Sequence, residues 1–153
     1  MSYNINLTGV AESLLCEFKL GSDYTITSTS SFSDTVPISS ISGDSIITLS
    51  SNVITLPAGY EFLVRFFLGI ERTSTSTYAY SKLHYSDGST IENTTTAKIN
   101  GTNGDSSSIE ESSSVIDTLN GSKSIIIKVN KSTSDVTKVI DSLSYGIILG
   151  FKK

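Results

Sequence analysis

The chain has 153 residues and a net charge of −4, because 15 Asp and Glu side chains outnumber 11 Lys and Arg side chains. This length predicts one domain with a substantial hydrophobic core. Charged residues make up 17% of the sequence, below the usual share of about 25%, and Ser and Thr are the main polar residues. The sequence has no basic cluster, which argues against nucleic acid as a partner because phosphate binding requires Lys and Arg.

The sequence also indicates where the protein is made. No apolar run approaches the length of a membrane span, so we expect no membrane insertion. The first residues do not combine a basic segment with an apolar one, so we expect no signal peptide and synthesis in a cytoplasm. The single cysteine, Cys16, cannot form a disulfide within the chain, and we expect it to be a small buried apolar residue.

Residues 1–35 are expected to form an N-terminal segment outside the main domain. Strands are predicted at residues 4–8 and 12–20, and a short amphipathic helix at residues 11–19 is the alternative. Residues 22–35, rich in Ser and Thr, are interpreted as an extended connector. By the two-residue period of a strand, the residues on one face of the second strand are Leu14, Cys16, Phe18 and Leu20.

The most apolar stretch of the sequence begins at Tyr60. It follows a strand predicted at residues 53–56, which ends at a Pro57-Ala58-Gly59 turn. The opposite face of the stretch is mixed, with Leu63 and Phe67 among charged and small residues, so we expect this strand to be central in its sheet or to contact a second subunit. The side chains predicted to face the core are Tyr60, Phe62, Val64, Phe66, Leu68 and Ile70.

Short strands separated by turns continue to the end of the chain. Val136–Leu143 fits either a helical turn or a bent connection. In the last strand, Gly146 and Gly150 lie on one face with Ile148, and the missing side chains permit a close approach there. The opposite face carries Tyr145, Ile147, Leu149 and Phe151. Further strands are predicted at residues 45–49, 78–85, 94–99, 115–119, 124–130 and 144–152. This spacing predicts an all-β fold, an antiparallel β-sandwich or jelly roll.

The sequence offers no recognisable catalytic constellation, so we expect no enzymatic activity, no cofactor and no metal site. His84 is the only histidine and is interpreted as a structural residue of a strand. Asp87-Gly88 is a hairpin signal, and neither it nor residues 100–105 carry enough carboxylates for a calcium loop. A glycan depolymerase is the enzyme alternative, but no acid pair or nucleophile–base pair supports it.

Tyrosines beside polar loops are the candidate ligand-contact residues. Tyr78 and Tyr80 follow the Ser/Thr-rich loop that contains Thr75, and a Tyr ring supplies contact area with a polar tip. The loop at residues 100–108 adds Asn103 and Asp105. Packing of the two tyrosines in the core or in a subunit interface is the alternative interpretation.

From Val36 to its end, the sequence resembles the C1q/TNF-like jelly-roll domains of tailed-bacteriophage structural proteins. The features that carry the resemblance are Val36-Pro37-Ile38, Ile54-Thr55-Leu56-Pro57-Ala58-Gly59-Tyr60 with the apolar strand behind it, the Tyr-rich strand that ends in Asp87-Gly88, and the closing strand from Ser144 to Phe151. In that family the Ile54–Gly59 stretch is a hairpin before the strand that lines the sandwich, and the closing strand returns beside it near the subunit axis.

The resemblance implies a non-enzymatic virion protein, a homotrimeric capsid decoration or head-fibre protein made in the host cytoplasm. Residues 1–35 would attach to the major capsid protein or other virion proteins, and residues 36–153 would form the jelly roll. A receptor- or glycan-binding tip of a tail fibre is the alternative. Exposed together, the apolar residues opposite the core would form a large patch for a monomer, and cyclic symmetry would bury it. The expected trimer interface comprises Leu63, Arg65, Phe67, Tyr145 and Ile148.

Overall fold

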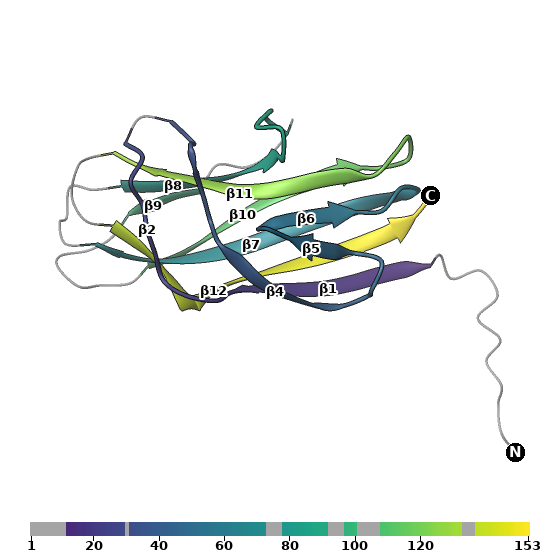
Figure 1. The fold of residues 1–153 in the computed structure, drawn as a ribbon, viewed down its shortest axis with the longest axis horizontal. Helices are drawn as coiled ribbons and strands as arrows, with labels where there is room; N and C mark the ends of the chain where they lie inside the picture. The colour runs from purple at the N-terminus through teal and green to yellow at the C-terminus, as the bar shows by residue number, and fades with distance from the viewer. Residues whose placement is uncertain (1–11, 30, 73–77, 92–96, 101–107, 133–136) are drawn as a thin grey trace, which may run out of the picture.

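The computed structural model describes residues 12–29, 31–72, 78–91, 97–100, 108–132 and 137–153. Regular structure in these residues consists of twelve β-strands (Figure 1). Their bounds are β1 Ser13–Leu20, β2 Tyr24–Thr25, β3 Asp34–Thr35, β4 Ile38–Gly43, β5 Thr48–Ser50, β6 Val53–Leu56, β7 Tyr60–Arg72, β8 Tyr78–Tyr85, β9 Ala97–Asn100, β10 Ser108–Asp117, β11 Lys123–Lys131 and β12 Thr137–Lys152. Within these described residues, no helix is long and apolar enough to cross a membrane.

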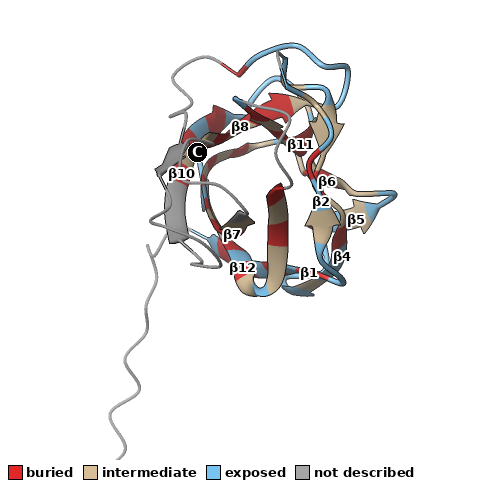
Figure 2. Cartoon of the chain, turned by 90° about the vertical axis from the view of Figure 1, so that its left-hand side faces the viewer, coloured by how far each residue is buried: buried red, intermediate tan, exposed pale blue. Residues whose placement is uncertain are grey.

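The strands form two antiparallel sheets that pack face to face, which confirms the predicted sandwich. The first sheet has the order β10-β7-β12-β1-β4, and β2 also pairs with β12. The second sheet has the order β5-β6-β11-β8-β9, and β3 also pairs with β11. Figure 2 shows the sandwich end-on, with β7, β12 and β1 along one layer and β8, β11 and β6 opposite.

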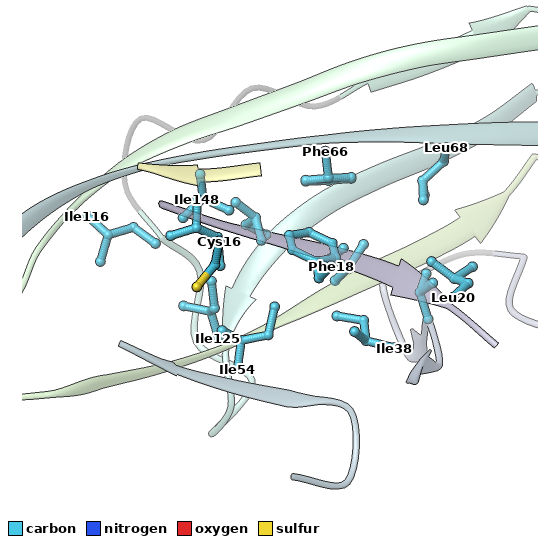
Figure 3. Close-up of a cluster of buried hydrophobic side chains, with 14 of the residues drawn as sticks. Cys16, Phe18, Leu20, Ile38, Ile54, Phe66, Leu68, Ile116, Ile125 and Ile148 are labelled. Atoms are coloured by element: carbon cyan, nitrogen blue, oxygen red, sulfur yellow. The ribbon is translucent and has the colours of Figure 1, made fainter. Parts of the chain in front are cut away.

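The core lies between the two sheets and follows the predicted alternation. The six β7 residues expected to face it, from Tyr60 to Ile70, are all buried. The same holds for the apolar face of β1, where Cys16 is buried as expected. Figure 3 shows Cys16, Phe18 and Phe66 among the clustered core side chains. The antiparallel pairing of β1 with β12 and β4 also rules out the helix considered for residues 11–19.

The hairpin that involves β6 lies before this strand, and not at Ile54–Gly59 as expected. The partner of β6 is β5, and Ser51 and Asn52 between them have φ of 49° and 68°, which is typical of a tight two-residue hairpin turn. The Pro57–Gly59 turn instead carries the chain from the second sheet to the first, because β6 and β7 belong to different sheets. The buried Thr118 hydroxyl holds this turn by donating to Pro57 O at 2.7 Å.

Residues 12–29 and 31–35 are part of the sandwich, although the whole segment 1–35 had been expected to lie outside it. β1 pairs with β12 from Ser13↔Phe151 to Lys19↔Tyr145 and with β4 on its other side. Its side chains alternate between exposed and buried, so the apolar face of β1 is removed from water only when β1 is part of the sheet. The strand expected at residues 4–8 lies outside the described residues.

β12 is one long strand with an irregularity. For Val136–Leu143 a helical turn and a bent connection had been considered, and residues 137–143 belong to this irregular strand. Its pairing with β7 shifts register between Ile140 and Tyr145. Within the bulge, the Ser144 hydroxyl donates to Ile140 O at 2.7 Å and accepts from Gly69 N at 3.0 Å. This hydroxyl replaces a ladder partner for Gly69, so the strand bends without leaving a buried amide unpaired.

Candidate assembly interface

The outer face of the first sheet carries most of the exposed large apolar side chains of the described residues. Of six such side chains, four lie on this face: Leu15, Val115, Tyr145 and Phe151, which are 52%, 56%, 43% and 48% exposed. The other two, Ile46 and Leu119, lie in turns. Single exposed apolar residues are ordinary, but a contiguous group marks a contact surface.

The strand register shows that these side chains are contiguous. Directly paired residues of an antiparallel sheet project to the same side, so each row of pairs across the sheet is a row of neighbours. One row joins β10, β7, β12 and β1 through the pairs Val115↔Leu63, Leu63↔Leu149 and Leu149↔Leu15. We refer to Val115, Leu63, Leu149 and Leu15 as the aliphatic row. It crosses four strands without a polar side chain.

An aromatic pair lies on the same face, four residues further along β7 than Leu63. Phe67 pairs with Tyr145, and their rings stack with centroids 4.7 Å apart and planes 20° apart. The guanidinium carbon of Arg65 lies 5.8 Å from the centroid of the Phe67 ring, a cation–π contact. Phe67 therefore contacts two other residues predicted for the trimer interface, Arg65 and Tyr145, and a fourth, Leu63, belongs to the aliphatic row.

The fifth predicted residue, Ile148, faces the other way, and its placement on this face was wrong. It is fully buried and pairs with the core residue Val64, and Figure 3 shows it among the core side chains. The register places Gly146, Ile148 and Gly150 toward the core, and the other half of β12 outward. Tyr145 and Ile148 are an odd number of residues apart, so a regular strand cannot present both on one face.

Sequence reasoning missed Leu15, Val115, Leu149 and Phe151 as members of this face. The signal was present in the alternation of β12, where Tyr145, Ile147, Leu149 and Phe151 share a side. To use this alternation, one must know which face of β12 lies on the same side of the sheet as Leu63 and Phe67 of β7. The pairing of the two strands decides this, and the sequence of β12 alone does not contain it. For Leu15, the missing information was that β1 belongs to this sheet at all.

Part of the outer face of the second sheet is contacted by another segment of the same chain. The segment of residues 24–29 and 31–35, which we call the strap, connects β2 on the first sheet to β3 on the second. The ring of Phe32 lies 5.7 Å from that of His84, which is on the side of β8 opposite the core residue Leu83. The Lys128 ammonium donates to Ser33 O at 3.1 Å.

Asp34 anchors the strap. Its carboxylate accepts hydrogen bonds from the amides of Thr27, at 2.5 Å, and Ser28, at 2.9 Å, and from the Thr27 hydroxyl. Partial burial alone would raise the pKa of Asp34. The backbone hydrogen bonds from Ser28 and Thr27, with the charge of Lys131, outweigh it and lower that pKa below its ordinary value.

The start of β1 and the end of β12 are tied together at one end of the sandwich. Glu12 accepts a hydrogen bond from the Tyr60 hydroxyl at 3.2 Å and forms an ion pair with Lys152. Hydrogen bonding by Lys152, and then its charge, lower the pKa of the Glu12 carboxyl. At the opposite end, the strands leading to residues 73–77, 101–107 and 133–136 finish side by side, as the pairs Arg72↔Thr137 and Tyr78↔Asn100 show.

Those of the remaining predicted positions that the structure describes offer no chemical site. Tyr78 and Tyr80 are half-buried, and Thr75, Asn103 and Asp105 lie outside the described residues. His84 is buried, and its Nδ1 lies 3.1 Å from Gly88 O in the turn at Asp87. Among the described residues, no three His, Cys, Asp or Glu side chains are grouped so that they could hold a metal ion. The strongest candidate site is therefore a surface for assembly.

Comparison with known proteins supports the fold. No protein-family model and no curated protein sequence matches the chain. Among solved structures, it is similar to Eiger TNF from S. frugiperda, with a TM-score of 0.55, 11% identity, and coverage of 92% of this chain and 93% of that one. It is also similar to a chain of infectious bursal disease virus, Gx strain, with a TM-score of 0.54 and 12% identity. The match covers 93% of this chain and 33% of the viral one. The chain has a TNF-like jelly-roll fold.

Proposed function

We propose that the chain is a non-enzymatic structural protein of a bacteriophage particle, which acts as a homotrimer on the capsid surface as a decoration or head-fibre protein. The observation that carries this proposal is the aliphatic row on the outer face of the first sheet. Leu15 and Val115 in this row are more than half exposed in the single chain. Covering the row with a second copy removes this apolar surface from water, which favours association.

The two outer faces differ in a way that supports self-assembly through only one of them. The strap contacts the outer face of the second sheet at His84, through Phe32, and at Lys128, and both His84 and Ile126 are buried on this face. No described segment of the chain crosses the aliphatic row. The fold is shared with a TNF protein and with part of a viral chain, which supports a role in a particle built from repeated subunits.

Attachment to the particle is proposed for the residues before β1. Within the expected segment 1–35, the described part belongs to the sandwich, so the proposed contact with the major capsid protein or another virion protein falls on residues 1–11. These residues precede Glu12, which lies at the end of the sandwich opposite Tyr78. The proposal therefore gives the molecule a capsid-side end and an outward end.

The trimer is tested by measuring mass in solution. Size-exclusion chromatography with light scattering at micromolar concentration is expected to give three times the chain mass of 16.3 kDa. Leu15→Asp places a charge in the aliphatic row and is expected to yield a folded monomer. Leu119→Asp is the matched control, because Leu119 is 46% exposed but lies in a turn. A monomeric wild-type chain, or equal dissociation by both variants, would refute the interface.

Attachment is tested on the phage particle itself. Antibody labelling of purified particles, viewed by electron microscopy, is expected to mark the capsid. A chain that lacks residues 1–11 is expected to remain a trimer but to be lost from particles. Labelling confined to the tail tip would instead favour the alternative, a receptor- or glycan-binding fibre tip. In that case Tyr78→Ala with Tyr80→Ala is expected to abolish binding on a glycan array.

A further inference from the structure

Two lysines are directly paired on the outer face of the second sheet. Lys128 of β11 pairs with Lys82 of β8, and His84, two residues further along β8, contacts the strap. We call Lys82 and Lys128 the lysine pair. Directly paired residues of antiparallel strands project to the same side with Cβ atoms roughly 5 Å apart, and like charges placed in this way repel. Both lysines are half-buried, so their stems lie along the sheet while their ammonium groups reach solvent.

No described acid shares this face with the lysine pair. The Lys128 ammonium donates to Ser33 O at 3.1 Å, and neither lysine forms an ion pair with a described residue. On β9, the next strand of the sheet, the residue paired with Tyr80 is another lysine, Lys98. The other described residues on this face of β8 and β11 are Tyr78, Tyr80, His84, Ser124, Ile126 and Asn130.

The described acids at the borders of this face have other partners. Asp34 of the strap is held by backbone amides of the strap itself, and its charge partner is Lys131. Asp87, in the turn after β8, accepts hydrogen bonds from the amide and the hydroxyl of Ser89. The chain has a net charge of −4, yet this face presents two like positive charges without a described carboxylate between them. A surface of this kind is complementary to an anion.

We propose that the lysine pair binds an acidic polysaccharide, with a carboxylate of the polymer held between the two ammonium groups. Each ammonium can donate a charge-assisted hydrogen bond to one oxygen of the same carboxylate. Tyr80 lies next to Lys82 on this face and is half-buried. Its ring offers flat contact area with a polar tip to the sugar that carries the carboxylate. The tyrosine ring beside the two charges favours a sugar over a simple ion.

The position of the lysine pair suits a long polymer. Figure 2 shows β8 and β11 in the layer opposite β7 and β12, so a trimer that covers the aliphatic row leaves the lysine pair in solvent. A single exposed ion pair is weak. Three copies that bind one polymer raise the apparent affinity through multivalency. The inference rests on the proposed function for this step, and it gives the capsid-bound trimer a role in holding the particle to an acidic cell-surface polysaccharide.

The test measures binding of the purified full chain to immobilised hyaluronan and alginate, two carboxylated polysaccharides. We expect binding that weakens as the salt concentration rises, and no binding to dextran, a neutral polysaccharide. Lys82→Glu with Lys128→Glu is expected to weaken binding at least about tenfold. Lys123→Glu with Lys153→Glu is the matched control, because it changes the net charge equally at two exposed lysines outside the pair, and it is expected to retain most of the binding.

Three results would refute the proposal. The first is a chain that binds neither polymer, and the second is equal weakening by the two double variants, which would reflect net charge alone. The third is equally tight binding to polyglutamate or single-stranded DNA, which would show recognition of charge without a sugar. Circular dichroism establishes that each variant is folded, and a misfolded variant is replaced by Lys82→Gln with Lys128→Gln.

The proposed trimer is tested separately. A trimeric chain that binds neither polymer would refute the lysine pair and leave the trimer standing. A monomeric wild-type chain whose binding depends on the lysine pair would refute the trimer and leave the site standing. The Leu15→Asp monomer is expected to bind more weakly than the wild-type trimer, because it loses multivalency, and its remaining binding is expected to depend on the same two lysines.

Discussion

At the residue scale, two glycines of β12 make room for two core phenylalanines. A Cβ added at Gly146 would lie closer to the ring of Phe18 than van der Waals contact permits, and one at Gly150 would meet Phe62 in the same way. Phe18 and Phe62 are among the largest fully buried side chains of the described residues. The close approach predicted for these glycines is therefore confirmed, and it occurs inside the sandwich.

This packing gives a prediction for Gly146. Gly146→Ala is expected to lower the free energy of unfolding by about 1–3 kcal/mol, because the added methyl group overpacks the site against Phe18. Chemical denaturation measures the change. Phe18→Leu removes the ring, so in the Phe18→Leu background the same alanine is expected to cost less. Equal costs in the two backgrounds would show that the methyl group does not meet the ring.

Asp34 gives a prediction on pH. Its folded-state pKa lies below the ordinary value of about 4, so its contribution to stability is present at neutral pH and is lost as pH falls through the folded pKa. Asp34→Asn is expected to reduce the free energy of unfolding at pH 7, and the difference from wild type is expected to shrink as the pH falls to about 3. Denaturation curves across this range measure it. A difference that stays constant with pH would contradict the assignment.

At the element scale, the β5–β6 hairpin depends on two residues with positive φ. Only a glycine, or a residue such as asparagine, adopts this conformation cheaply. Asn52→Ala is expected to destabilise the protein by about 1 kcal/mol, while Asn52→Gly is expected to be neutral or stabilising. Thermal and chemical denaturation of both variants compare them directly. If alanine and glycine at residue 52 are equally stable, the turn geometry does not control the hairpin.

The same scale shows what the sequence could and could not predict. The alternation from Tyr60 to Ile70 correctly placed six core residues, because one face of β7 is wholly apolar and the period of two allows a single solution. For β12 both faces are apolar or small, so the pattern is compatible with either orientation. The register with β7 decides it, and Ile148 was assigned to the outer face because that register is a long-range property.

The position of the strap in the fold could not be predicted from local sequence patterns either. Residues 22–35 are polar and contain only a few apolar anchors, so they were interpreted as a connector outside the domain. Their order depends on one carboxylate, Asp34, and on contacts with β8 and β11, which are 50 or more positions away in the chain. Of the five residues predicted for the interface, four lie on the outer face of the first sheet, whereas Leu15 and Val115 were not predicted because their place on this face depends on the alignment of several strands.

At the scale of the whole molecule, the distribution of apolar side chains distinguishes the two sheets. The strap contacts one outer face at His84 and Lys128, while the other face presents the aliphatic row and the aromatic pair together. A sandwich with this asymmetry is suited to association through one side only. The Leu15→Asp experiment tests this face by disturbing its apolar surface.

The junction of Glu12, Tyr60 and Lys152 has a practical consequence for engineering. Any tag added after Lys153 emerges beside residue 12, at the corner where the proposed capsid contact begins, and would compete with it for space. A peptide inserted at the Asp87–Gly88 hairpin tip would instead extend from the second sheet, on the layer opposite the aliphatic row. Cargo displayed at the hairpin leaves the aliphatic row unobstructed.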